Sequence, residues 1–91
     1  MLYIRKVVGT SMTPCLKSGQ IVVFLRTRNY EQSDVVLAKI VNKEVVKRIK
    51  NIAGSKVWLQ GDNSLESTDS REYGPILIEH IYGRLVLPRL N

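Results

Sequence analysis

The chain has little of what metal centres and disulfide scaffolds require. Its 91 residues include one cysteine, Cys15, and one histidine, His80. A single cysteine excludes an intrachain disulfide and a cysteine-based metal site. One histidine cannot supply a multi-histidine metal centre. We therefore expect neither a metal ion nor another cofactor.

Long apolar runs are also missing. No segment approaches the roughly 20 consecutive apolar residues that a membrane-spanning helix needs. Arg5 and Lys6 stand where a signal peptide would have its apolar region. The sequence therefore predicts a soluble chain, either cytoplasmic or peripherally associated with a membrane.

The charge balance is basic, with a formal net charge of +6 and a pI near 9.8. Such a charge permits attraction to nucleic acid or to an anionic membrane surface. The basic residues are spread along the whole sequence, as on a solvated surface. Charge alone thus establishes neither partner, and it leaves the oligomeric state open.

A helical pattern is missing too, because apolar residues nowhere recur with a 3.6-residue period for more than about two turns. The apolar residues form short runs rich in Val, Ile and Leu, which are typical of strands. We expect strands at 21–25, 34–40, 45–49, 56–59 and 81–87, turns at 42–43 and 54–55, and short helical turns at 31–33 and 78–80. The predicted fold is all-β: one domain, residues 1–91, with a small, twisted, partly closed antiparallel sheet.

The segment 8–14 contains the candidate nucleophile, Ser11. Gly9 permits backbone angles that other residues avoid, and Pro14 biases Thr13 towards an extended conformation. Such a turn would present the Ser11 hydroxyl and its backbone N–H to one point in space. Taken alone, these residues favour a tight turn with an incidental serine.

An activated serine needs a base, usually histidine and in some enzymes lysine. His80 has an apolar context that is more typical of a structural or exposed histidine. Lys47 alternates with Val45 and Ile49, so the three share one strand face. With a pKa of about 10.4, only about one lysine in 2,500 is neutral at pH 7, and a three-unit drop on burial would raise this to roughly 30%. Periodicity leaves open whether Lys47 or Val46 points inward.

The segment 61–74 is polar and almost devoid of core-forming residues. A loop of this length in a small domain is uncommon and is often functional. Its Asp, Asn, Ser and Thr side chains favour order, because they bond to nearby backbone groups. The alternative is a flexible surface loop.

Three blocks together resemble the type I signal peptidases, which are serine proteases with a Ser/Lys dyad in the same broad fold group as LexA-type repressor peptidases. The blocks are Gly9-Thr10-Ser11-Met12-Thr13-Pro14-Cys15-Leu16, then Val46-Lys47-Arg48-Ile49, then Gly61-Asp62-Asn63 with Ser67-Thr68-Asp69-Ser70-Arg71-Glu72-Tyr73-Gly74. The third block is the most specific, because it fixes many positions. The end of the third block is similar to the corresponding segment of the mitochondrial inner-membrane peptidases.

The resemblance implies a role for each matching residue. Ser11 would be the nucleophile, with its N–H in the oxyanion hole, and Lys47 would be the base. The implied supporting residues are Ser67, which would orient Lys47, Asp62 paired with Arg48, Asp69 paired with Arg71, and Met12 in the substrate groove. Gly9 departs from relatives that place a second oxyanion donor at this position. The implied substrate is a signal or leader segment of a precursor polypeptide, which is soluble for the compact relatives that mature nickel superoxide dismutase.

Three other readings stay open. A LexA-like domain would cleave its own chain. A basic β-barrel would bind nucleic acid through aromatic residues such as Phe24 and Trp58, but this reading leaves the third block unexplained. A cysteine peptidase built on Cys15 and His80 is the weakest, because a structural thiol explains Cys15.

Overall fold

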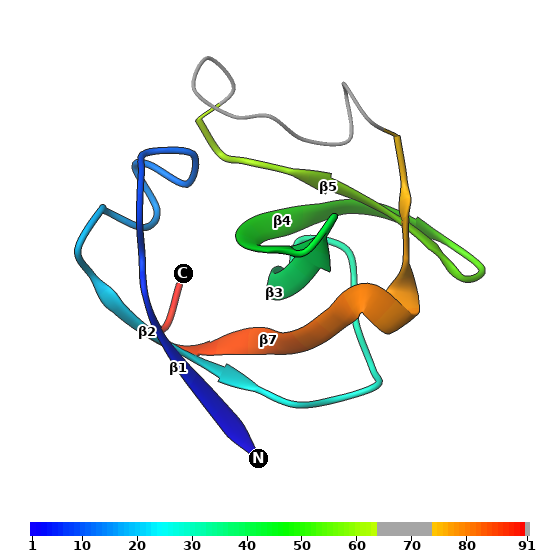
Figure 1. Ribbon diagram of the computed structural model, residues 1–91, viewed down its shortest axis with the longest axis horizontal. Coiled ribbons are helices and arrows are strands. Elements are labelled where there is room, and N and C mark those ends of the chain that lie inside the picture. The colour runs from blue at the N-terminus through cyan, green and yellow to red at the C-terminus, as the bar shows by residue number, and fades with distance from the viewer. Residues whose placement is uncertain (64–73, 91) are drawn as a thin grey trace.

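The computed structural model describes residues 1–63 and 74–90 (Figure 1). These residues form an antiparallel sheet and one short 3-10 helix. The elements are β1 (Leu2–Lys6), β2 (Ile21–Leu25), β3 (Val35–Ile40), β4 (Lys43–Ala53), β5 (Lys56–Gln60), β6 (Ile76–Leu77), η1 (Ile78–His80) and β7 (Ile81–Leu87). Within these ranges, no helix has the length or the apolar character to cross a membrane.

The strand order across the sheet is β1-β2-β7-β3-β4-β5-β6, and every pairing is antiparallel. The sheet is strongly curled (Figure 1). It is not closed, because no pairing joins β6 to β1 among the described strands. In Figure 1, β2 and β7 line the lower side, β4 and β5 the upper side, and β3 lies between them. The predicted all-β fold is confirmed.

The predicted strands are all present, but the sheet contains two more. The strand β1 was not predicted because charged residues end it, and β6 has only two residues. The strand β4 extends well beyond the predicted 45–49, through a register shift between Ile49 and Asn51. The predicted turn at 78–80 is the helix η1, whereas 31–33 forms a turn in which the Asp34 N–H donates to the Glu31 carbonyl at 3.1 Å.

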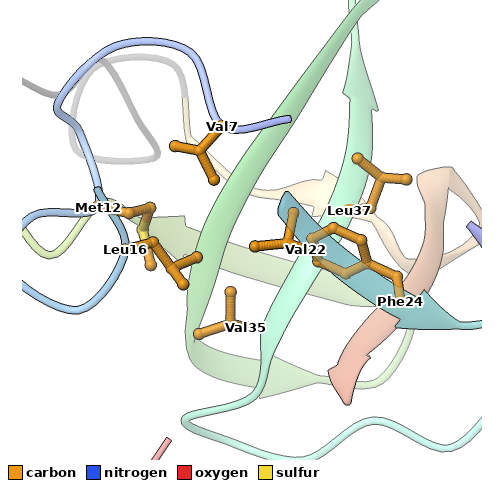
Figure 2. Close-up of a cluster of buried hydrophobic side chains, with 7 residues drawn as sticks. All are labelled: Val7, Met12, Leu16, Val22, Phe24, Val35 and Leu37. Atoms are coloured by element: carbon orange, nitrogen blue, oxygen red, sulfur yellow. The ribbon is translucent and has the colours of Figure 1, made fainter. Parts of the chain in front are cut away.

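Two apolar clusters cover the two faces of β3, whose residues 35–38 are all buried. Val35 and Leu37 point into the first cluster, together with Phe24 from β2 (Figure 2). Val36 and Ala38 point into the second cluster. An amphipathic strand would bury one face only, so this continuous apolar run reflects the curl of the sheet around β3.

Gly83 in β7 lies close to the backbone of the neighbouring strand β2. A Cβ added there would lie 2.7 Å from the carbonyl oxygen of Leu25 in β2. Because that contact is with backbone, β2 and β7 would have to move apart. We expect Gly83→Ala to lower the free energy of unfolding by about 1–3 kcal/mol, as overpacking does. Urea denaturation measures this, with Arg84→Ala on the exposed side of the same strand as control. Equal effects of the two substitutions would contradict the packing argument.

Candidate functional site

Ser11 lies in the connection between β1 and β2, and its side chain is half-buried. Met12, the next residue, is fully buried in the first apolar cluster with Leu16, as Figure 2 shows. The Leu16 N–H donates to the Met12 carbonyl at 2.9 Å. The residue after the candidate nucleophile is therefore anchored in the core. Gly9, at φ +84°, has no other atom near an added Cβ, so glycine is needed there for its backbone conformation and not for space.

Asn63 clamps the Ser11 loop through hydrogen bonds from its backbone and from its side chain. Its backbone N–H donates to the Ser11 carbonyl at 2.8 Å. Its side-chain Nδ2 donates to the Thr10 carbonyl at 3.1 Å and to Thr13 Oγ1 at 3.0 Å. The Thr13 hydroxyl itself donates to the Thr10 carbonyl at 2.9 Å. One residue thus holds the carbonyl of Ser11 and the residues on both sides of it.

Lys47 lies in β4, directly opposite Val36 of β3, and is only 5% exposed. It shares a strand face with Val45 and Ile49, which pack in the second apolar cluster. The next residue back, Val46, packs against the first cluster. Both Lys47 and Val46 therefore point towards packed apolar side chains, because the curled sheet has apolar packing on both faces.

A groove of about 600 Å³ joins the two candidate residues. One wall is the segment 5–12, which includes Ser11 and Met12, and the other is the segment 43–47, which ends at Lys47. Leu37 and Ile40 of β3 complete the lining. Met12 borders this groove, although its side chain belongs mainly to the core, and its contact with a substrate stays a prediction. Residues far apart in sequence meet along one cleft.

The groove lies between strand segments that have unpaired sides. The pairing of β4 with β5 begins at Arg48, so residues 43–46 pair with β3 alone among the described strands. In the same part of the structure, β1 pairs with β2 and with no other described strand. Backbone N–H and C=O groups without strand partners can pair with an added extended segment.

Arg48, next to Lys47, forms the predicted ion pair with Asp62. Arg48 Nε and Nη2 donate to the two carboxylate oxygens at 2.8 and 2.9 Å. Nη1 donates to the Ser33 carbonyl at 2.8 Å. The side chains are 28% and 16% exposed, so the pair is largely shielded from water. The hydrogen bond from Arg48 holds the pKa of the Asp62 carboxyl below its ordinary value.

This ion pair connects the two halves of the site. Lys47 precedes Arg48 in β4, and Asn63 follows Asp62 in the chain. Asn63 holds the Ser11 loop, so covalent and hydrogen bonds run continuously from Lys47 to Ser11. The Gly61-Asp62-Asn63 block is visible in the sequence, but the family resemblance implies no role for Asn63. The position of Asn63 beside Asp62 was the available signal.

Cys15 and His80 do not form a second candidate pair. Hydrogen bonding to Asp62, together with burial, raises the pKa of the Cys15 thiol, which opposes formation of the reactive thiolate. His80 is exposed on η1, and η1 lies on the opposite side of the molecule from the Ser11 loop in Figure 1. The same separation removes His80 as a base for Ser11.

Three predicted supporting residues, Ser67, Asp69 and Arg71, lie outside the described residues, so their roles stay predictions. No group of three or more His, Cys, Asp or Glu side chains within residues 1–63 and 74–90 is arranged to hold a metal ion.

Comparison with known proteins gives one family and two curated relatives. The family model described as Peptidase S24-like matches residues 1–86. Mitochondrial inner membrane protease subunit 1 of Xenopus tropicalis is 46% identical over 43 residues, which are 47% of this chain and 26% of that protein. The protein of the same name from Mus musculus is 48% identical over 42 residues, 46% of this chain and 25% of that protein. The matched segments thus span about a quarter of each relative.

Proposed function

The chain belongs to the Peptidase S24-like family, and from this we propose that it is a serine endopeptidase with a Ser11/Lys47 dyad that cleaves a signal or leader segment from a precursor polypeptide. One observation carries the proposal: a half-buried serine on a clamped loop and a buried lysine line the same groove. The names of the two relatives, both proteases of the mitochondrial inner membrane, support the same class of activity.

The proposed chemistry has two steps. Neutral Lys47 accepts the Ser11 hydroxyl proton as Ser11 Oγ attacks the scissile carbonyl, and the resulting ammonium donates that proton to the leaving amine. Lys47 then takes a proton from the water that attacks the acyl-enzyme carbonyl, and it returns that proton to Ser11 Oγ as the acyl bond breaks, which restores the hydroxyl and the neutral amine. Burial of Lys47 works in the required direction, because desolvation disfavours the ammonium form.

The Ser11 N–H is proposed as a donor to the oxyanion of the tetrahedral intermediate, an interaction that typically contributes a few kcal/mol. Its position depends on the loop conformation that Asn63 holds through the Ser11 carbonyl. Ser67 is proposed to orient Lys47, as the family resemblance implies.

The proposed substrate is an extended segment of polypeptide. Residues 43–46, which pair with β3 alone among the described strands, offer main-chain groups to such a segment, and the residues that line the groove would limit which substrate side chains fit there. The preference for small residues near the cleaved bond is carried over from the signal peptidases.

The test is cleavage of an Ala-x-Ala peptide library in mild detergent by the wild type and by dyad variants from pH 6 to pH 10. Cleavage by the wild type alone supports the dyad. Shortening of the chain itself, at a rate independent of protein concentration, would instead show a self-cleaving domain. Salt-sensitive binding of a single-stranded oligonucleotide, without any cleavage, would favour the nucleic-acid reading.

Asn63 provides a separate prediction. Removal of its side-chain amide deletes two hydrogen bonds to the Ser11 loop while the backbone bond to the Ser11 carbonyl remains. We expect Asn63→Ala to lower kcat about 10- to 100-fold, because a misplaced nucleophile lowers kcat more than it weakens substrate binding. Steady-state kinetics measures kcat and KM. Asn51→Ala, at an exposed position in β4, is the matched control, and a change in KM alone would contradict a positioning role.

A further inference from the structure

An ion pair spans the end of the groove that lies away from Ser11. Arg5 Nε and Nη2 in β1 donate to the Glu44 carboxylate in β4 at 2.8 and 3.0 Å. Arg5 is also held from its own strand, since Nη1 donates to the Ile4 carbonyl at 3.0 Å and the guanidinium lies 5.7 Å from the ring centroid of Tyr3. The two walls of the groove are therefore joined at this end by a charged contact.

Positive charge exceeds negative charge at this end. Arg5, Lys6 and Lys43 line it with one carboxylate, Glu44, a formal net charge of +2. Lys39 lies directly opposite Glu44 in the β3–β4 pairing and adds a further cation. The hydrogen bond from Arg5, followed by the charges of Arg5 and Lys39, keeps the pKa of Glu44 low, so this carboxylate stays ionised and its negative charge is already paired with a cation of the protein. Lys43, which precedes Glu44 in β4, is exposed.

The distance to the reacting groups follows from strand geometry. The four antiparallel pairings along β1-β2-β7-β3-β4 give β1 and β4 the same direction, so Arg5 precedes Ser11 on one wall as Glu44 precedes Lys47 on the other. Three residues of strand separate Glu44 from Lys47, which is about 10 Å at roughly 3.3 Å per residue. An extended substrate with its scissile bond between Ser11 and Lys47 would reach the ion pair with its third or fourth residue from that bond.

We propose that this charged end of the groove is a subsite for an acidic side chain of the substrate, three to four residues from the scissile bond. The proposal rests on the proposed peptidase function. The middle of the groove is lined by Val7, Ile40 and Val45 and accepts apolar or small side chains. A carboxylate at the charged end meets Lys43 and the outer face of Arg5, whereas an ammonium there meets uncompensated positive charge.

The experiment uses fluorescein-labelled Ala-rich decapeptides in which one Glu, Gln or Lys is moved through positions 2–5 on either side of the cleaved bond. For the wild type, kcat/KM is expected to favour Glu over Lys about fivefold at position 3 or 4 on one side, the upper range for an exposed charge pair. The preference is expected to shrink in 0.5 M NaCl. Lys43→Glu is expected to remove or reverse it. Lys50→Glu, on an exposed part of β4 outside the groove, changes the net charge equally and is expected to retain it.

Binding of the same peptides to Ser11→Ala, measured by fluorescence anisotropy, separates this inference from the proposed chemistry. Equal affinities for the Glu and Lys peptides, or equal effects of Lys43→Glu and Lys50→Glu, would overturn the acidic subsite even if the wild type cleaves every peptide. Charge-selective binding that responds to Lys43→Glu, together with cleavage that survives in Ser11→Ala, would keep the subsite and reject the dyad.

Discussion

Ser11→Ala and Lys47→Met are each expected to lower kcat/KM for a cleaved Ala-x-Ala peptide by at least about 10³-fold, as the loss of a nucleophile or of its base does in serine peptidases. The two residues act as one unit, so the double variant is expected to be no slower than either single variant. Methionine keeps most of the apolar length of Lys47 in a position that is 5% exposed, so the fold is expected to persist. Cleavage assays with matched protein concentrations measure both effects.

The controls address folding and charge. Ser18→Ala changes an exposed serine in the same connection, and Lys39→Met removes a lysine from the exposed part of β3. Both controls are expected to retain the activity of the wild type on uncharged peptides. Unchanged cleavage by Ser11→Ala or by Lys47→Met, with circular dichroism showing intact sheet structure, would reject the dyad.

The pH dependence tests the base itself. Only the neutral amine of Lys47 can accept the Ser11 proton, so kcat/KM is expected to rise tenfold per pH unit below the apparent pKa and to level off above it. A histidine base would give the same rise in rate near pH 6–7, but the chain's single histidine belongs to η1, which Figure 1 shows on the other side of the molecule from the Ser11 loop. A rate that is constant from pH 6 to pH 10 would contradict lysine as the base.

Asp62→Asn is expected to lower the free energy of unfolding by about 2–3 kcal/mol. Exposed ion pairs contribute about 0–1 kcal/mol, whereas breaking a buried pair costs about 3–5 kcal/mol, and the Arg48–Asp62 pair lies between these limits. A neutral amide cannot accept two charge-assisted hydrogen bonds, so the guanidinium of Arg48 loses its counter-charge. For a chain of this length, whose total stability is expected to be about 5–14 kcal/mol, such a loss is large. Urea denaturation measures it.

The Arg5–Glu44 pair is the matched control. It has the same two-pronged geometry, but its side chains are 37% and 40% exposed. Glu44→Gln is therefore expected to cost less than about 1 kcal/mol. Equal destabilisation by the two substitutions would show that burial does not determine the contribution of these pairs.

Acid should weaken the effect of Asp62→Asn. The pKa of Asp62 is lowered in the folded chain, chiefly by hydrogen bonding from Arg48. Its stabilisation is therefore fully present above the unfolded pKa of about 3.9 and is lost as the pH falls through the lower folded pKa. The difference in stability between wild type and Asp62→Asn is expected to shrink in that range. A difference that grows on acidification would contradict this sign.

The sequence predicted the strands with long β-branched runs and the turns with glycine or asparagine. It did not predict β1. In this strand Leu2, Ile4 and Lys6 are exposed and Tyr3 and Arg5 are only half-buried, so apolar and polar residues do not separate onto two faces. It also left the orientation of Lys47 undecided. Alternation assumes one buried face, whereas this sheet curls until both faces of β3 and β4 are packed.

The site was predicted in part because family blocks fix residue identity but not contacts. The Arg48–Asp62 pair follows from such blocks and is present. The clamp by Asn63 depends on which backbone carbonyls of the Ser11 loop face it, and loop conformation is not encoded in periodicity. The Arg5–Glu44 contact joins residues 39 positions apart through a curl that no local pattern specifies.

Among the described strands, β1 and residues 43–46 each have a side that pairs with no other strand, and this has a consequence for handling the protein in concentrated solution. Strand edges of this kind recruit other strands, including those of identical chains, and can seed aggregation. Arg5, Lys6 and Lys43 place like charges on the approaching surfaces of two copies, and the overall charge of +6 adds a longer-range repulsion. Colloidal stability should therefore fall when salt screens these charges or when the pH approaches 9.8, which favours storage of the chain at low ionic strength near neutral pH.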